Sequence, residues 1–128
     1  MKTTHDPRHL KRKRVMQDLF TWEFNKEEEL KTDTSQKIIK NLPTIDKHIK
    51  DSATAWPLEQ INKVDLAILR LAVFELIIEK DVPFRVITDE AVELAKEFGS
   101  ESSPSFVNGV LGSLITINKL EEHTEDNL

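Results

Sequence analysis

The sequence contains no cysteine and only three glycines among its 128 residues. Without cysteine, the chain can form no disulfide, no thiolate nucleophile and no cysteine-based zinc site. Extended β architectures usually need more glycines than this at their turns. No hydrophobic run approaches the roughly 20 residues of a membrane helix, and no apolar signal-peptide segment follows the basic N-terminus. We therefore expect an all-α protein that is cytoplasmic and makes no membrane contact.

Catalytic motifs are also lacking. None of the four histidines lies at metal-ligand or catalytic-triad spacing from an acid, and there is no glycine-rich phosphate loop. Asp89, Glu90 and Glu93 cluster near the start of one predicted helix, where a carboxylate pair can do acid–base chemistry. We favour a solvated helix start stabilised by the helix dipole. The sequence thus predicts a non-enzyme with no catalytic residue, metal or cofactor.

Length and composition indicate one soluble globular domain spanning residues 1–128. The chain is long enough to bury a core, with 38% hydrophobic and 32% charged residues. The Leu, Ile, Lys and Glu residues recur at helical spacing. Predicted helices cover about residues 8–26, 57–61, 64–78, 84–98 and 103–117, and a further helical stretch reaches residue 49, with Thr32, Asp33 and Thr34 as its possible N-caps. Residues 119–128 are polar and acidic and are expected to form a frayed tail.

Positive charge is concentrated at one end of the chain. Residues 1–14 carry six Lys or Arg against one acid, a local charge of +5, whereas the remaining residues sum to −10. Such a basic arm is a typical electrostatic footprint for a polyanion. From the residues alone, it fits either RNA or DNA contact or simple solubilisation. Phe20 and Trp22 lie close to this arm in the sequence, so their rings can stack on unpaired bases whose phosphates contact the arm. Core packing is the commoner role of Trp22.

Local signals mark several helix ends. Asp6 followed by Pro7 is a helix start, and Ser103 followed by Pro104 is another. Gly99 follows a predicted helix and is expected to cap it in the left-handed conformation.

The helix boundaries in the middle of the chain depend on one proline. Ile38, Leu42, Ile45 and Ile49 form one apolar stripe, which Pro43 interrupts. The sequence leaves open whether Pro43 kinks one helix or begins a second.

The segment from Val64 to Ile78 is apolar nearly all round, which predicts a helix at the centre of the bundle. Its only charged residues are Asp65, Arg70 and Glu75. Asp65, together with Glu59 just before the segment, can form the polar rim of a protein interface. A solvated helix face is the simpler interpretation.

Gly109 and Gly112 lie inside a predicted helix, where each costs roughly 0.5–1 kcal/mol relative to alanine. They imply close approach by another group. One interpretation is a neighbouring helix; the other is a ligand or RNA backbone near Phe106, Asn108 and Gly109. The Asn108 amide can read a base or a 2′-hydroxyl.

Three segments in order resemble the NusB family of bacterial transcription antitermination factors. The longest is TDEAVELAKEFGSESSPSFVNGVL (Thr88–Leu111), which resembles the family's I-N-E-A-V-E-L-A-K and F-V-N-G-V-L motifs. VDLAILRLAVFEL (Val64–Leu76) resembles V-x-x-A-I-L-R-x-A-x-Y-E-L. The Arg-rich start followed by RVMQDLFTW (Arg14–Trp22) resembles the family's first helix.

The resemblance implies an all-helical fold made of two small helical subdomains. It also implies pairing with the ribosomal protein NusE and binding of boxA-type single-stranded RNA. In the family, this heterodimer joins NusA, NusG and RNA polymerase to support ribosomal RNA transcription. No cofactor or reaction is implied.

By position, the resemblance places RNA contacts on the arm and on Phe106, and partner contacts on Phe20 and Asp65. With the residues singled out above, the RNA-binding candidates are Arg8, His9, Lys11, Arg12, Phe106 and Asn108. The partner-binding candidates are Phe20, Glu59 and Asp65.

The chain departs from the family pattern in two places. His9 stands where Arg is usual, and Lys13 and Arg14 add cations. The stretch before Trp56 is shorter than usual, so the family's second helix is expected to be trimmed or lost.

Two alternatives stay open at this point. The chain can be a protein-interaction module, or a homodimer, in which the partner supplies most of the RNA binding. It can also be an RNA-docking domain related to those fused to ribosomal RNA methyltransferases. The sequence fixes neither the oligomeric state nor the preferred RNA sequence.

Overall fold

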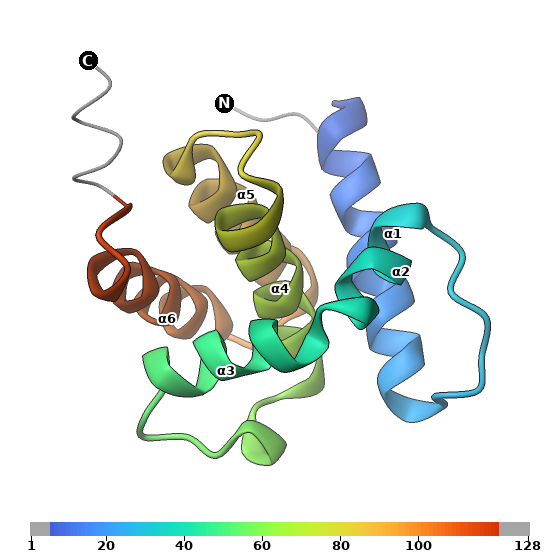
Figure 1. Ribbon diagram of the computed structural model, residues 1–128, viewed down its shortest axis with the longest axis horizontal. Coiled ribbons are helices and arrows are strands. Elements are labelled where there is room, and N and C mark those ends of the chain that lie inside the picture. The colour runs from blue at the N-terminus through green and yellow to red at the C-terminus, as the bar shows by residue number, and fades with distance from the viewer. Residues whose placement is uncertain (1–5, 121–128) are drawn as a thin grey trace.

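The computed structural model describes residues 6–120, which form six α-helices and no strand (Figure 1). The helices are α1 (Pro7–Phe24), α2 (Asp33–Lys40), α3 (Leu42–Ser52), α4 (Lys63–Val73), α5 (Phe84–Phe98) and α6 (Ser103–Ile117). A short 3-10 helix, η1 (Leu58–Gln60), precedes α4, and a π-helical segment, η2 (Phe74–Glu79), follows it. The predicted all-α class is confirmed.

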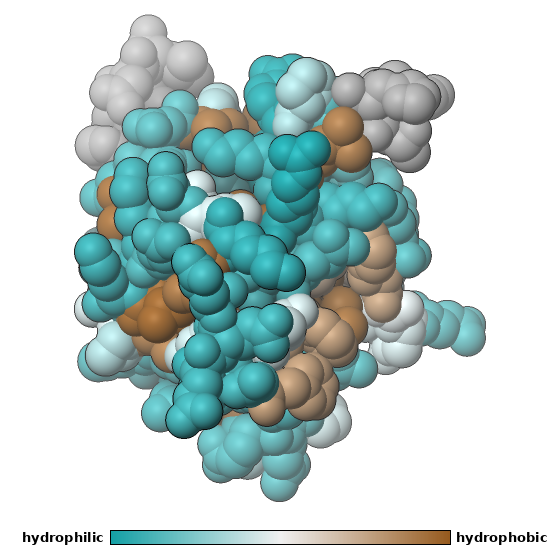
Figure 2. Space-filling view, turned by 90° about the vertical axis from the view of Figure 1, so that its right-hand side faces the viewer, coloured by the Kyte–Doolittle hydropathy of each residue, from teal (hydrophilic) through white to brown (hydrophobic). Residues whose placement is uncertain are grey.

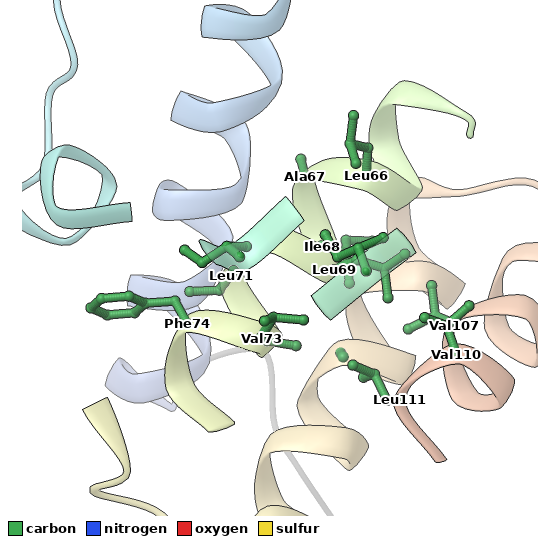
Figure 3. Packing of buried hydrophobic residues seen from close by; sticks show 14 of the residues in the cluster. Leu66, Ala67, Ile68, Leu69, Leu71, Val73, Phe74, Val107, Val110 and Leu111 are labelled. Atoms are coloured by element: carbon green, nitrogen blue, oxygen red, sulfur yellow. The ribbon is translucent and has the colours of Figure 1, made fainter. Parts of the chain in front are cut away.

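Helix α4 is the centre of the bundle, as its sequence predicts. It packs against α1, α2, α3, α5 and α6. Figure 1 shows α1 and α2 on one side of α4, and α5 and α6 on the other. In Figure 3, Leu71 and Phe74 lie on one side of α4, and Val107 and Leu111 of α6 lie on the other. These side chains belong to one continuous cluster of buried hydrophobic residues.

The predicted helix over residues 64–78 changes its hydrogen bonding halfway. Its last part is η2, in which the Lys80 backbone N–H donates to the Glu75 carbonyl oxygen, at 2.9 Å. Lys80 then adopts a left-handed conformation with φ of 59° and ends the helix. The π-helical segment contains Glu75, which is buried and contacts α1 as described below.

The start of α1 follows the local signal in the sequence. The Asp6 carboxylate accepts a hydrogen bond from the Arg8 backbone N–H, and Pro7 occupies the first turn of α1. Helix α5 has the predicted bounds, and its residues Ile87, Ala91, Leu94 and Ala95 are buried.

Pro43 begins a second helix. Helix α2 ends at Lys40, and Pro43 lies in the first turn of α3, where its missing N–H costs no hydrogen bond. The shortened middle of the chain therefore retains α2 as eight residues. The loop before α2 is held by Asp18 of α1, whose carboxylate accepts from the backbone N–H groups of Lys31 and Thr32.

The turn between α5 and α6 differs from the expectation. Gly99 caps α5 with φ of −90°, so the predicted left-handed cap is wrong. A Cβ at Gly99 would lie 2.5 Å from the Ser103 Cβ, so close approach of α6 excludes a side chain there. The N-cap of α6 is Ser102 rather than Ser103. The Ser103 hydroxyl is buried and accepts a hydrogen bond from the Ser100 N–H instead.

Arg70 is a buried cation of α4 that joins three helices. Its Nη1 donates to Glu23 of α1 at 2.6 Å, and its Nε and Nη2 donate to both carboxylate oxygens of Asp46 of α3 at 3.0 Å. Burial lowers the pKa of Arg70, but its hydrogen bonds to Asp46 and Glu23 outweigh this and raise it. The guanidinium therefore acts as a fixed charge at the junction of α1, α3 and α4.

We expect Arg70→Ala to lower the free energy of unfolding by about 3–5 kcal/mol, because it leaves Glu23 and Asp46 without their shared cation. Urea unfolding followed by circular dichroism measures this. The control is Lys47→Ala, which removes an exposed pair with Asp51 and should change stability by less than about 1 kcal/mol. Equal effects of the two substitutions would contradict the structural role of Arg70.

Candidate nucleic-acid interface

The described part of the basic arm is the first half of helix α1. Lys2 lies outside the described residues. The Arg8 side chain is 83% exposed, and Lys11 and Arg14 are also exposed. Each cation is three residues from the next, so consecutive members are neighbours on the helix surface, and the row turns by about 120° between Arg8 and Arg14. We call Arg8, Lys11 and Arg14 the cationic ridge.

His9 lies in the interior, in contrast to the cationic ridge. Its Nδ1 is 3.1 Å from a carboxylate oxygen of Glu90, and its Nε2 is 3.3 Å from one of Glu97. Both carboxylates belong to α5. Each ring nitrogen thus has a carboxylate partner on α5. His9 therefore joins α1 to α5.

Arg12 is also turned inward, with only 11% of its side chain exposed. Its Nε and Nη2 donate to the two carboxylate oxygens of Glu75, at 2.9 and 2.7 Å. Its Nη1 lies 3.6 Å from Glu90. The predicted RNA contacts of His9 and Arg12 stay predictions, but both side chains contact carboxylates inside the molecule.

The prediction of a solvated helix start at Asp89, Glu90 and Glu93 is wrong for Glu90, which is buried against His9 and Arg12. No local pattern predicts this contact, because Glu90 and His9 are 81 residues apart.

Lys13 and Glu97 complete the contact between α1 and α5. The Lys13 ammonium donates to Glu97 at 3.2 Å and lies 5.3 Å from the centre of the Phe98 ring. Desolvation raises the pKa of Glu97, but the hydrogen bonds from Lys13 and His9 outweigh it, so the pKa is lowered. The ionised form of Glu97 is thus the one that holds α1 in place.

Phe106 of α6 lies beside Trp56, an aromatic residue for which the sequence predicts no functional role. The rings of Phe106 and Trp56 meet edge to face, with centroids 6.3 Å apart and planes at 84°. Trp56 is in the loop between α3 and η1 and is 51% exposed. The only sequence signal for this pairing is an aromatic residue in a polar loop just before Pro57.

Asn108 faces a different side of α6. It is exposed and lines an open hollow of about 710 Å³ between α5 and α6, together with Asp89, Glu93 and Lys96 among others. Two residues along a helix are about 200° apart, so Phe106 and Asn108 cannot share one face. The structure does not bring these two candidates together.

Gly109 and Gly112 are exposed, and a Cβ on either would meet no atom within 4 Å. The interpretation that a neighbouring helix of this chain approaches them is therefore wrong. Close approach by a ligand or by RNA stays a prediction.

Of the partner-binding candidates, Phe20 and Glu59 reach the surface and Asp65 is buried. Phe20 is half-buried and contacts Phe24, with ring centroids 5.0 Å apart, and Phe24 is 65% exposed at the end of α1. Glu59 is exposed on η1. Figure 2, which faces the α1 side, shows a mostly hydrophilic surface with small separate hydrophobic areas. Phe24 is the residue that the sequence analysis missed.

Asp65 is only 5% exposed. This burial contradicts both predictions for it, the rim of an interface and a solvated helix face. It lies in the first turn of α4, and its Oδ1 accepts no hydrogen bond from the described residues. Burial raises the pKa of Asp65, an effect that the Ser103 hydroxyl only partly offsets. A buried carboxylate in this position cannot form the rim of an interface.

Among residues 6–120, no helix has the length and apolar character needed to cross a membrane. The fold and the surface define a helical-bundle protein that presents a cationic ridge and isolated aromatic residues. The NusB family model matches residues 2–116. The chain belongs to the NusB family, which confirms the resemblance seen in three sequence segments.

Individual relatives agree with this assignment. The chain is 52% identical over 77 residues to the transcription antitermination protein NusB of Dehalococcoides mccartyi, covering 60% of this chain and 54% of that protein. It is 53% identical over 77 residues to the NusB protein of Alkaliphilus oremlandii, covering 60% and 56%. The aligned region thus spans little more than half the length of these relatives.

Solved structures share the fold. A structure of T. maritima NusB superposes with a TM-score of 0.76 at 36% identity, covering 91% of this chain and 93% of that one. A chain from a complex of NusB and NusE with double-stranded RNA superposes with a TM-score of 0.74. At 22% identity, covering 88% of this chain and 99% of that one, the latter match shows the fold alone.

We expect Asp65→Asn to raise the free energy of unfolding at pH 7, on the order of 1 kcal/mol, because it removes a poorly paired buried charge. The folded-state pKa of Asp65 lies above its ordinary value of 3.8. The cost of ionisation is thus present above the folded-state pKa, and the advantage of Asn fades as the pH falls towards 3.8. Urea unfolding at pH 7 and pH 4 tests this, with exposed Asp51→Asn as the control. A less stable Asp65→Asn at pH 7 would contradict the argument.

Proposed function

We propose that the chain is an RNA-binding transcription antitermination factor that binds boxA-type single-stranded RNA and pairs with the ribosomal protein NusE. The observation that carries this proposal is the cationic ridge of Arg8, Lys11 and Arg14 on a chain whose net charge is −5. Relatives with the same family assignment are named for antitermination. In this role the chain acts by binding, without a catalytic step or a cofactor.

The buried ion pairs make the cationic ridge a rigid feature. His9 and Arg12 attach α1 to α5 and η2, which turns Lys11 and Arg14 toward solvent. Lysine and arginine on RNA phosphates release counterions, which supplies affinity without sequence preference. We assign phosphate contact to the cationic ridge and attachment of the helix to His9 and Arg12.

Base contacts are assigned to α6, where the resemblance places them. Phe106 offers a ring for stacking, and Asn108 offers an amide for hydrogen bonds. Because these residues face different sides of α6, one nucleotide cannot contact both. We propose that Phe106 contacts a base and that Asn108 contacts a different nucleotide.

The NusE contact is assigned to the end of α1. Phe20 and Phe24 form an aromatic pair with its outer member largely exposed. Exposed aromatic residues are common anchors of protein interfaces. NusA, NusG and RNA polymerase are proposed to join through the heterodimer. Asp65 has a structural role in this proposal because it is buried.

A second candidate function is a protein-interaction module, or a homodimer, whose partner supplies most of the RNA binding. The exposed ring of Phe24 favours this alternative. The two functions differ in whether the chain alone binds RNA with sequence preference.

We expect the double variant Arg8→Ala/Lys11→Ala to bind boxA-type RNA more weakly and with a smaller salt dependence. Losing two phosphate contacts should reduce the slope of log K against log salt by about 1.4 for a single strand. Fluorescence anisotropy at several salt concentrations measures the slope. The control Lys37→Ala/Lys40→Ala removes the same charge from exposed positions on α2 and should leave the slope nearly unchanged. Equal slopes for both double variants would contradict the assigned ridge.

We expect Phe24→Ala to weaken binding of NusE by more than tenfold, since truncating an interface hot spot costs about 2 kcal/mol or more. RNA binding by the chain alone should not change. Calorimetric titration with NusE measures the first effect, and anisotropy with boxA-type and scrambled RNA measures the second. If the unmodified chain distinguishes these RNAs only when NusE is present, the interaction-module alternative replaces the proposal.

A further inference from the structure

Trp56 is a large aromatic residue held in an exposed position by its backbone. Its backbone N–H donates to the carbonyl oxygen of Ala53, at 3.0 Å, and Ala53 is itself buried at the end of α3. On its other side, Pro57 restricts the chain and accepts a hydrogen bond from the Gln60 N–H. The indole is therefore presented by a loop that is fixed at both ends.

The contact with Phe106 leaves part of the Trp56 ring free, because Trp56 is 51% exposed, whereas Phe106 is half-buried against the hydrophobic core. In an edge-to-face pair, the edge of one ring meets one face of the other, and the remaining faces are not used by the pair. Gly109 follows Phe106 by three residues and is thus its neighbour on the helix surface. A Cβ at Gly109 would meet no other atom, so no side chain of α6 at that position obstructs approach to the rings.

The size of this patch indicates a small planar partner. Trp56 is the only exposed large hydrophobic residue between α3 and α4 in the described chain, with the smaller apolar residues Ala55 and Pro57 exposed on either side of it. A stable protein interface buries about 800 Å² on each partner, usually around a contiguous apolar centre. Two adjacent rings instead resemble the aromatic platforms on which successive unpaired bases stack.

We propose that Trp56 and Phe106 together form a stacking site for unpaired bases of single-stranded RNA, in which Trp56 supplies the larger and more exposed ring. This inference rests on the proposed RNA-binding function and adds a residue from the α3–η1 loop to it. Of these two rings, the resemblance assigns RNA contact to Phe106 only. The pairing across 50 positions of sequence makes the base site a joint product of α6 and this loop.

Intrinsic fluorescence tests the stacking directly, because the chain has two tryptophans. In the variant Trp22→Phe, Trp56 is the single tryptophan, and its emission should be quenched when boxA-type RNA is added at low salt. Polyphosphate serves as the control polyanion, since it engages the cationic ridge but has no bases to stack. Quenching by polyphosphate equal to that by RNA would overturn the inference.

Affinity measurements with matched variants provide the second test. Trp56→Ala should weaken binding of boxA-type RNA roughly tenfold, the equivalent of one lost base stack. Trp56→Phe should retain most of the affinity, because a ring remains. RNA oligonucleotides with one base removed at each position in turn should show one or two positions where the loss is large for the unmodified chain and small for Trp56→Ala.

The outcomes separate this inference from the proposed function. If RNA binds with the expected salt dependence but Trp56→Ala binds as tightly as the unmodified chain, the stacking site is wrong and the function stands. If the unmodified chain does not bind RNA at all, the proposed function fails. If Trp56→Ala retains RNA affinity but loses NusE binding, the patch is a protein contact and the inference is overturned. Unchanged circular dichroism and thermal unfolding of Trp56→Ala establish that the fold is retained.

Discussion

The bidentate ion pair between Arg12 and Glu75 is the contact on which the position of α1 and its proposed surfaces depends. It joins the first half of α1 to the π-helical end of the central helix, and it is shielded from water on both sides. Near the other end of α1, Glu23 accepts a hydrogen bond from the buried Arg70. Helix α1 is thus held by one arginine–carboxylate contact near each end, with the charges exchanged between the two.

These two contacts determine the rotation of α1 about its own axis. Hydrophobic packing alone, through Val15, Met16 and Leu19, attracts a helix face without specifying exact angles. Paired guanidinium and carboxylate groups have a defined geometry, and removing one partner of a buried pair is costly, about 3–5 kcal/mol. The rotation that buries Arg12 exposes Lys11, which lies about 100° away around the helix. Arg8 lies one turn before Arg12 on nearly the same side of α1 and is exposed because it is at the start of the helix. The buried Arg12 contact therefore fixes the direction of Lys11.

The sequence predicts the helices of this chain much better than its contacts. Asp6 with Pro7 and the apolar spacing of α5 are local signals, so the corresponding helix bounds are confirmed. Glu75 and Arg12 are 63 residues apart, and no local pattern connects them. Asp65 shows the same limit, because its burial depends on the packing of the start of α6 against α4.

The family resemblance does not remove this limit for the candidate site. It places an Arg-rich start on α1, but it does not say which of those cations turn inward. Only the three-dimensional packing separates His9 and Arg12 from Arg8 and Lys11. Likewise, it places Phe106 on α6 without indicating that the Trp56 ring meets it. Side-chain chemistry was thus predictable position by position, whereas side-chain direction was not.

The corner between α5 and α6 connects the cationic ridge to the aromatic pair. Helix α1 contacts the last turn of α5 through Glu97 and Phe98, and α6 begins after the short turn that contains Gly99. Phe106 lies in the first turns of α6, just beyond this corner. The exposed Glu101 lies in this turn, where its charge disfavours phosphate. The proposed phosphate contacts and the proposed base contacts are thus carried by different elements of one bundle, because the first lie on α1 and the second on α6 and the loop before η1.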